Sequence, residues 1–98
     1  MNLEEYLLSS LSEECGEIIQ AVCKAQRFGL DDEYKGRATP RTQILNEVRD
    51  LLGVIDALED LEVIPEVATF ETAAHIQSKR DKIDKYITYA QERGTLII

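Results

Sequence analysis

Three long stretches of this sequence carry apolar residues at helical spacing, and each is bounded by residues that start or end helices. Asn2 can cap the first stretch and Gly29 stops it, while Thr39 and Pro40 form a good helix start for the second. The expected helices run from after Asn2 to about Phe28, from Pro40 to about Asp60, and from about Thr69 to Arg93. The sequence therefore predicts an all-α protein.

The middle helix indicates how these elements pack. Its apolar residues cover more than one stripe, which predicts burial on two sides: Ile44, Leu45, Val48, Leu51, Leu52, Val54, Ile55, Leu58 and Leu61. A 98-residue chain is expected to be one domain over residues 1–98, and it can bury only about two thirds of its unfolded surface. We therefore expect a bundle of three long helices, with a short helical turn after Pro65 and a four-helix core completed by dimerisation.

The segments outside the helices differ in character. Residues 29–41 contain two glycines, a proline and mixed charges without apolar periodicity, and we expect a mobile loop there. The tail TLII, residues 95–98, is apolar and is expected to pack on a neighbouring element.

Charge and composition exclude several classes of protein. Acidic residues outnumber basic ones 19 to 11, and the net charge of -8 opposes binding to nucleic acid through a broad surface. The sequence has no apolar run long enough for a membrane span and no basic start followed by an apolar run, so we expect a soluble, cytoplasmic protein without a membrane partner. Cys15 and Cys23 would lie about 12 Å apart along one helix, which predicts free thiols.

Two pairs of acidic residues stand out within the apolar stripes. Glu14 and Glu17 lie in the first helix and Glu47 and Asp50 in the second, each pair at i,i+3 spacing on one face. Glu14 also interrupts the stripe of apolar residues on its helix instead of lying opposite it. These acids are therefore predicted to point toward the core.

Four carboxylates brought together repel one another, and the few local bases do not offset this charge. A hard divalent cation would offset this charge. Oxygen ligands favour Mg²⁺, with Mn²⁺ as a substitute, over zinc or copper. A zinc site lacks the usual ligand spacing, and a di-iron bundle would need Glu-x-x-His motifs, whereas His75 has alanine three residues before it. The alternative is an ordinary solvated face or a structural network of charges.

The same residues carry a resemblance to a known family. EECGE at residues 13–17 and EVRD at residues 47–50 resemble the EExxE and ExxD signature of the MazG-like all-α nucleoside triphosphate pyrophosphohydrolases. The likeness extends to LSEECGEIIQAVCKAQRFGLDD and to KRDKIDKYITYAQERGTL, so it covers nearly the whole chain. The chain is similar to the small single-domain members found in phages and bacteria.

The resemblance implies a magnesium-dependent cleavage of a nucleoside triphosphate to a monophosphate and pyrophosphate. It implies that Glu14, Glu17, Glu47 and Asp50 are metal ligands, and that Glu13 orients or deprotonates the attacking water. It also implies assembly as a homodimer or homotetramer, and a role in clearing noncanonical or surplus nucleotides.

Basic and aromatic residues supply candidates for binding the substrate. Lys24 continues the face of Glu17 and Arg27 follows near the helix end, although both also suit a solvated helix C-terminus. In the third helix, Lys79, Lys82, Tyr86 and Tyr89 form a stripe that we expect to be distinct from the isoleucine face, and that equally suits an amphipathic rim or a subunit contact. Phe28 and Tyr34 are weaker candidates for stacking on a base.

Two other functions fit the sequence. One is a noncatalytic helical interaction protein with a structural cation site. The other is a related hydrolase that acts on phosphoribosyl compounds or alarmone nucleotides with the same metal core.

Overall fold

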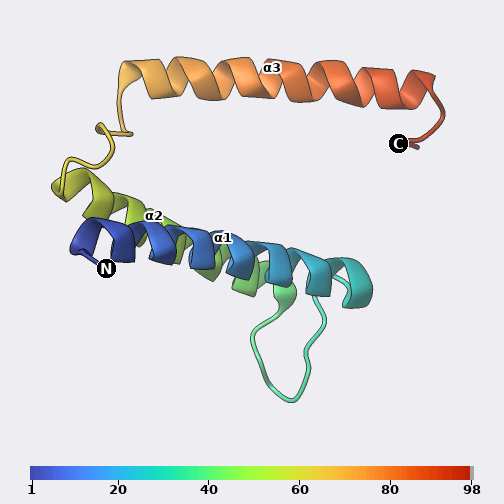
Figure 1. The fold of residues 1–98 in the computed structure, drawn as a ribbon. Helices are drawn as coiled ribbons and strands as arrows, with labels where there is room; N and C mark the ends of the chain where they lie inside the picture. The colour runs from blue at the N-terminus through green and yellow to red at the C-terminus, as the bar shows by residue number, and fades with distance from the viewer. Residues whose placement is uncertain (98) are drawn as a thin grey trace. The chain divides into compact units, whose positions relative to one another are not determined.

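The computed structural model describes residues 1–97, which are all-helical and contain no strand (Figure 1). The helices in this range are α1 (Leu3–Phe28), α2 (Pro40–Asp60) and α3 (Phe70–Glu92). These bounds agree with the sequence predictions to within a residue. The helical turn predicted after Pro65 is absent, and residues 61–69 contain only turns, bends and irregular backbone. The chain divides into two compact units, one of residues 1–65 and one from Glu66 onward.

The helix starts follow from capping side chains. The side-chain oxygen Oδ1 of Asn2 accepts a hydrogen bond from the Glu5 N–H at 2.8 Å, and the Thr39 hydroxyl accepts one from the Thr42 N–H at 3.3 Å. Thr69 caps α3 in the same way. Each bond pairs a backbone N–H that has no partner within its own helix.

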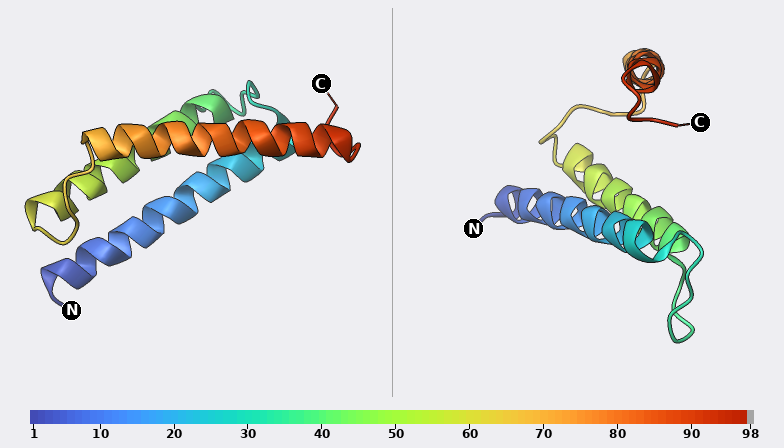
Figure 2. Two further views of the ribbon diagram at one scale, coloured as in Figure 1. Left: turned by 90° about the horizontal axis from the view of Figure 1, so that it is seen from above. Right: turned by 90° about the vertical axis from the view of Figure 1, so that its right-hand side faces the viewer.

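In the first unit, α1 and α2 pack side by side as an antiparallel pair (Figure 2). Gly29 ends α1 with a φ of 94°, a left-handed conformation that glycine adopts without steric cost, and its N–H donates to the Ala25 carbonyl at 2.9 Å. The chain then returns through residues 30–39 to α2. This hairpin sets the faces of the two helices that contact each other.

The interior of this unit is small. Among residues 1–97, only Ala21, Pro40 and Leu58 are buried. On α2 the side chains of Leu45 and Leu52 remain 47% and 56% exposed. Within this unit α1 covers one face of α2, so the predicted burial on a second side is not provided by α1.

The second unit contains α3 and the residues that follow it. The backbone N–H groups of Thr95 and Leu96 donate to the Ala90 carbonyl at 3.0 and 3.2 Å, so the tail turns back onto its own helix. Leu96 is half-buried and Ile97 is exposed, while Ile98, the last residue of the TLII prediction, lies outside the described residues.

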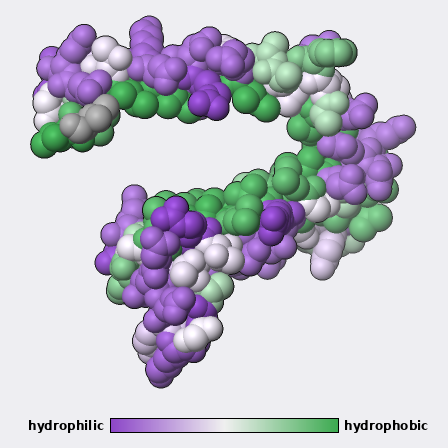
Figure 3. Space-filling view, turned by 180° about the vertical axis from the view of Figure 1, so that it is seen from behind, coloured by the Kyte–Doolittle hydropathy of each residue, from purple (hydrophilic) through white to green (hydrophobic). Residues whose placement is uncertain are grey.

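Apolar residues remain uncovered in both units. Figure 3 shows apolar residues gathered along one side of α3 and, separately, along one side of the α1–α2 pair. On α3 these include Ile76, Ile83 and Ile87, which are all exposed. Within residues 1–97, no helix has both the length and the apolar character needed to cross a bilayer. Cys15 and Cys23 are free and exposed.

Candidate metal centre

Three carboxylates converge where α1 and α2 pack. Glu14 from α1 and Glu47 and Asp50 from α2 each offer one oxygen, and these three oxygens all lie within 4.8 Å of one another. The arrangement follows from the sequence pattern, because Glu14 occupies the stripe of α1 that faces α2. The i,i+3 spacing of Glu47 and Asp50 then presents both acids on the same side of α2.

The three side chains differ in how far they are buried. Glu14 and Glu47 are half-buried, whereas Asp50 is exposed, so the sequence prediction that the acids point into the core is wrong for Asp50. Glu14 Oε2 is shielded from solvent and has no hydrogen-bond partner. Within the described part of the chain, no lysine or arginine forms an ion pair with any of the three.

Electrostatics link the group to two further glutamates. Burial raises the pKa of Glu14 above its ordinary value, and the negative charges of Asp50, Glu47, Glu13 and Glu17 raise it further. Burial also raises the pKa of Glu47, followed by the charges of Glu17 and Asp50. The half-buried Glu17 is thus part of the same acidic neighbourhood, although it is not one of the three residues whose oxygens converge.

The other candidates on α1 are Glu13, next to Glu14, and Lys24 and Arg27, near the end of the helix. Glu13 is exposed, and its charge acts on Glu14. Lys24 is half-buried and lines a hollow near the end of the helix. The Arg27 guanidinium lies over the Phe28 ring, 5.3 Å from its centroid.

The hollow beside Lys24 contains residues that sequence reasoning did not select. Phe28 and Tyr34 also line it, as do Asp32, Arg37 and Gln43, which were not candidates. The sequence did carry a signal for Gln43, because it lies four residues before Glu47 and so shares its helix face. Asp32 and Arg37 belong to the loop, where no periodic pattern indicates direction.

The α3 candidates occupy the second unit. Lys79, Lys82 and Tyr86 line a separate open hollow together with Ile83 and Ile87. The stripe of basic and aromatic residues thus adjoins the isoleucine face along one side of α3. His75 is exposed on this helix.

Comparison of the chain with protein-family models, with curated proteins and with solved structures finds no match.

Proposed function

We propose that this chain is a magnesium-dependent nucleoside triphosphate pyrophosphohydrolase. It would cleave a ribo- or deoxyribonucleoside triphosphate between the α and β phosphates, giving the monophosphate and pyrophosphate, and so clear unwanted nucleotides. The convergence of Glu14, Glu47 and Asp50 is the observation that carries this proposal. These residues belong to the two segments that resemble the MazG-like signature, EECGE and EVRD.

The donor set fits a hard dication. All three converging atoms are carboxylate oxygens, the ligand type that magnesium and manganese prefer. The shielded Glu14 Oε2 has no hydrogen-bond donor in the described chain, and a buried oxygen without a partner is costly. A bound cation would remove that cost and the mutual repulsion that raises the pKa values of Glu14 and Glu47.

Each acidic residue has a role in the proposal. Glu14, Glu47 and Asp50 hold the cation directly, and Glu17 either joins them or adds negative charge beside them. Bound magnesium neutralises triphosphate charge and lowers the pKa of a coordinated water. Glu13, one residue before Glu14, orients that water or takes its proton.

Basic residues in each unit are candidates for binding the substrate. Lys24 and Arg27 follow Glu17 along α1 and supply positive charge for phosphate oxygens. Lys79, Lys82 and Tyr86 are retained as substrate-binding candidates of the second unit, where they line one hollow. A protein of net charge -8 can then hold an anionic substrate, because the bound cation supplies positive charge locally.

We also propose that two copies form a four-helix core, as a dimer or within a tetramer. Leu45, Val48 and Leu52 lie at i, i+3 and i+7 on α2, and all three are exposed in the single chain. On α1, Leu8, Ile19 and Val22 are likewise exposed. Apolar surface of this extent is typical of an interface.

The test is release of pyrophosphate from a panel of nucleoside triphosphates in the presence of magnesium. Asp50→Ala and Glu47→Ala should reduce kcat/KM by more than about 100-fold, since each removes a proposed metal ligand. Asp56→Ala is the matched control, because Asp56 is an exposed acid on α2 outside the converging group. Circular dichroism verifies that each variant remains helical.

Several results would contradict the proposal. Orthophosphate as the first product would place cleavage at a different bond. Cleavage of phosphoribosyl compounds or alarmone nucleotides, but not of triphosphates, would assign a related hydrolase. Binding of magnesium without any hydrolysis would favour the noncatalytic protein with a structural cation site.

A further inference from the structure

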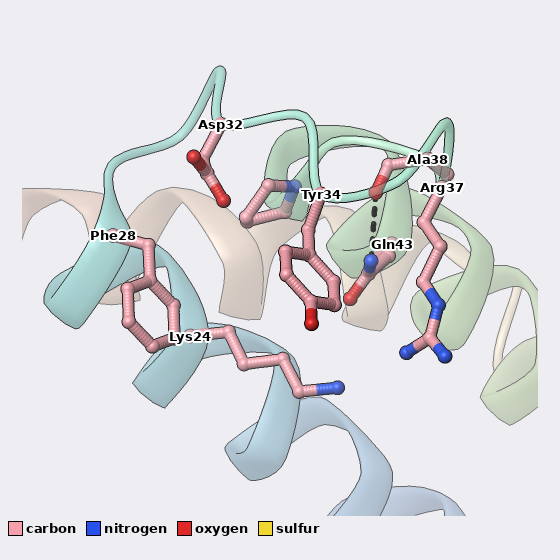
Figure 4. Close-up of a pocket in the computed structure, with 8 residues that line it drawn as sticks. Lys24, Phe28, Asp32, Tyr34, Arg37, Ala38 and Gln43 are labelled. Atoms are coloured by element: carbon pink, nitrogen blue, oxygen red, sulfur yellow. Dashed lines mark hydrogen bonds between the residues drawn. The ribbon is translucent and has the colours of Figure 1, made fainter.

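A hollow of about 220 Å³ lies at the end of the α1–α2 hairpin, under the connecting loop (Figure 4). Its wall is formed by the last turns of α1, the first turn of α2 and the loop between them. Figure 4 shows the rings of Phe28 and Tyr34 and the ammonium end of Lys24 on the same side of the loop. The hollow belongs entirely to the first unit.

The lining combines the rings of Phe28 and Tyr34 with the basic side chains of Lys24 and Arg37 and the acidic side chain of Asp32. Cations also lie over both rings, two of them from residues outside the lining. The Arg27 guanidinium lies 5.3 Å from the centroid of Phe28, and Lys35 Nζ lies 5.3 Å from that of Tyr34. The Arg37 guanidinium lies 5.8 Å from the same tyrosine ring. Phe28 and Tyr34 are 60% and 58% exposed, so both side chains are accessible to a ligand. Such a wall suits a ligand that has an aromatic ring and a negatively charged group close to it.

Contacts at both ends of the loop hold this wall in place. Arg41 at the start of α2 donates two hydrogen bonds to the Asp31 carboxylate, at 3.0 and 3.2 Å, and its backbone N–H donates to the Leu30 carbonyl. At the other end, Gln43 Nε2 donates to the Ala38 carbonyl at 2.7 Å. Hydrogen bonds thus join the loop to α2 on both sides of Tyr34.

The position of the hollow relates it to the carboxylate group. Lys24 lies seven residues after Glu17, about 10 Å along α1, and Gln43 lies four residues before Glu47, about 6 Å along α2. These spacings keep each pair on the same face of its helix. A nucleotide has the right form to join the two places, because its ribose separates an aromatic base from a chain of phosphates.

We propose that this hollow receives the base of a nucleotide whose phosphates lie toward Glu14, Glu47 and Asp50. This inference rests on the proposed function and adds the residues that hold the base. Phe28 and Tyr34 stack on it, and Lys24 neutralises a phosphate between base and cation. A space of this size suits a ring system rather than a whole nucleotide, since sites that enclose drug-sized ligands measure about 300–1,000 Å³.

The edge of the hollow carries hydrogen-bonding groups for the base. With Gln43 Nε2 engaged by Ala38, the side-chain oxygen of Gln43 is left to accept hydrogen bonds. The Asp32 carboxylate, which also lines the hollow, can only accept when ionised. Two acceptors favour a base with an exocyclic amino group, such as cytosine or adenine.

The test compares Tyr34→Ala and Phe28→Ala with Tyr6→Ala, a matched change at an exposed tyrosine of α1 outside the hollow. Calorimetry measures binding of nucleoside monophosphates and of inorganic tripolyphosphate, which has no base, each with magnesium and with EDTA. Loss of one stacking ring should weaken nucleotide binding about 5- to 150-fold. Tripolyphosphate binding should be unchanged, as should the behaviour of Tyr6→Ala.

Activity measurements separate this inference from the proposed function. Tyr34→Ala should raise KM for the triphosphates by a similar factor with little change in kcat. Normal hydrolysis with an unaltered KM in both variants would overturn the base site and leave the hydrolase intact. Conversely, binding that depends on Tyr34 without any release of pyrophosphate would retain the base site and reject the hydrolase. Equal losses for tripolyphosphate and nucleotide would also overturn the base site.

Discussion

Glu14 and Glu47 bring carboxylate oxygens within 4.8 Å of each other across the contact between α1 and α2. Burial is the largest cause of the raised pKa of each group, and neighbouring carboxylates add to it. Among residues 1–97, no basic side chain pairs with either of them. Their ionised forms are therefore unfavourable together, and either a proton or a cation relieves the repulsion.

Glu14→Gln should stabilise the protein in EDTA at neutral pH, because the amide removes one charge from the acidic group. The same change should abolish most of the increase in melting temperature that magnesium gives the unaltered protein. Thermal unfolding with and without magnesium measures both effects. Asp56→Asn, which removes one charge of α2 outside the converging group, is the control. A magnesium effect retained in Glu14→Gln would contradict this role.

Stability in EDTA should fall as pH rises above 4.5, the ordinary value for glutamate, through the raised pKa values of Glu14 and Glu47. In that window the folded protein holds protons that the unfolded chain has released, so the free energy of unfolding decreases with pH. Urea unfolding at a series of pH values measures this slope. The double variant Glu14→Gln and Glu47→Gln should lose most of it, and an unchanged slope would contradict the prediction.

At lower pH, ionisation of Asp31 should make the free energy of unfolding increase as pH rises. The hydrogen bond from Arg41 is the main cause that lowers the pKa of Asp31 below its ordinary value of 3.8. The stabilising contribution of this group is present above 3.8 and is lost as pH falls through the lowered pKa. Asp31→Asn should reduce the loss of unfolding free energy at low pH in the same urea series. Asp60→Asn, which changes an exposed acid at the end of α2, should not.

Leu58→Ala should lower the free energy of unfolding by about 2–5 kcal/mol, the usual cost of a cavity at a fully buried leucine. Leu58 is 0% exposed, whereas Leu3 is 60% exposed and supplies a matched control. Leu3→Ala should change the free energy of unfolding by no more than about 0.5 kcal/mol. Chemical denaturation measures both variants, and equal effects would contradict the placing of Leu58 in the interior.

Leu52→Glu should convert the proposed dimer into monomers, because it places a charge in the exposed apolar row of α2. Gln20→Glu adds the same charge at an exposed polar position of α1 and should leave the assembly intact. Light scattering after size-exclusion chromatography measures the molar mass of each. A monomeric unaltered protein, or a Leu52→Glu variant that remains dimeric, would contradict the proposed core.

The helix ends were predictable from sequence because they depend on local chemistry. Asn2 and Thr39 each accept the hydrogen bond expected of a capping side chain, and Gly29 adopts the positive φ expected of a helix stop. The second covered face predicted for α2 is not supplied by α1. Periodicity identifies an apolar face but does not say whether the same chain covers it.

Part of the candidate site was likewise predictable from the sequence, and part was not. Helical spacing predicted that Glu14, Glu47 and Asp50 come together, since a stripe position fixes direction on a helix. It did not reveal the hollow, whose wall depends on contacts of Gln43 with Ala38 and of Arg41 with Asp31. Such contacts join a loop to a helix and have no fixed spacing along the chain.

Burial limited to Ala21, Pro40 and Leu58 in the described chain has a consequence for regulation. Under the proposed assembly, each copy supplies the interior that the other lacks, so folding follows the law of mass action. The expression level of the gene would then help to determine what fraction of the chains is native. Scarce chains would be open to proteases, and abundant chains would protect one another from degradation.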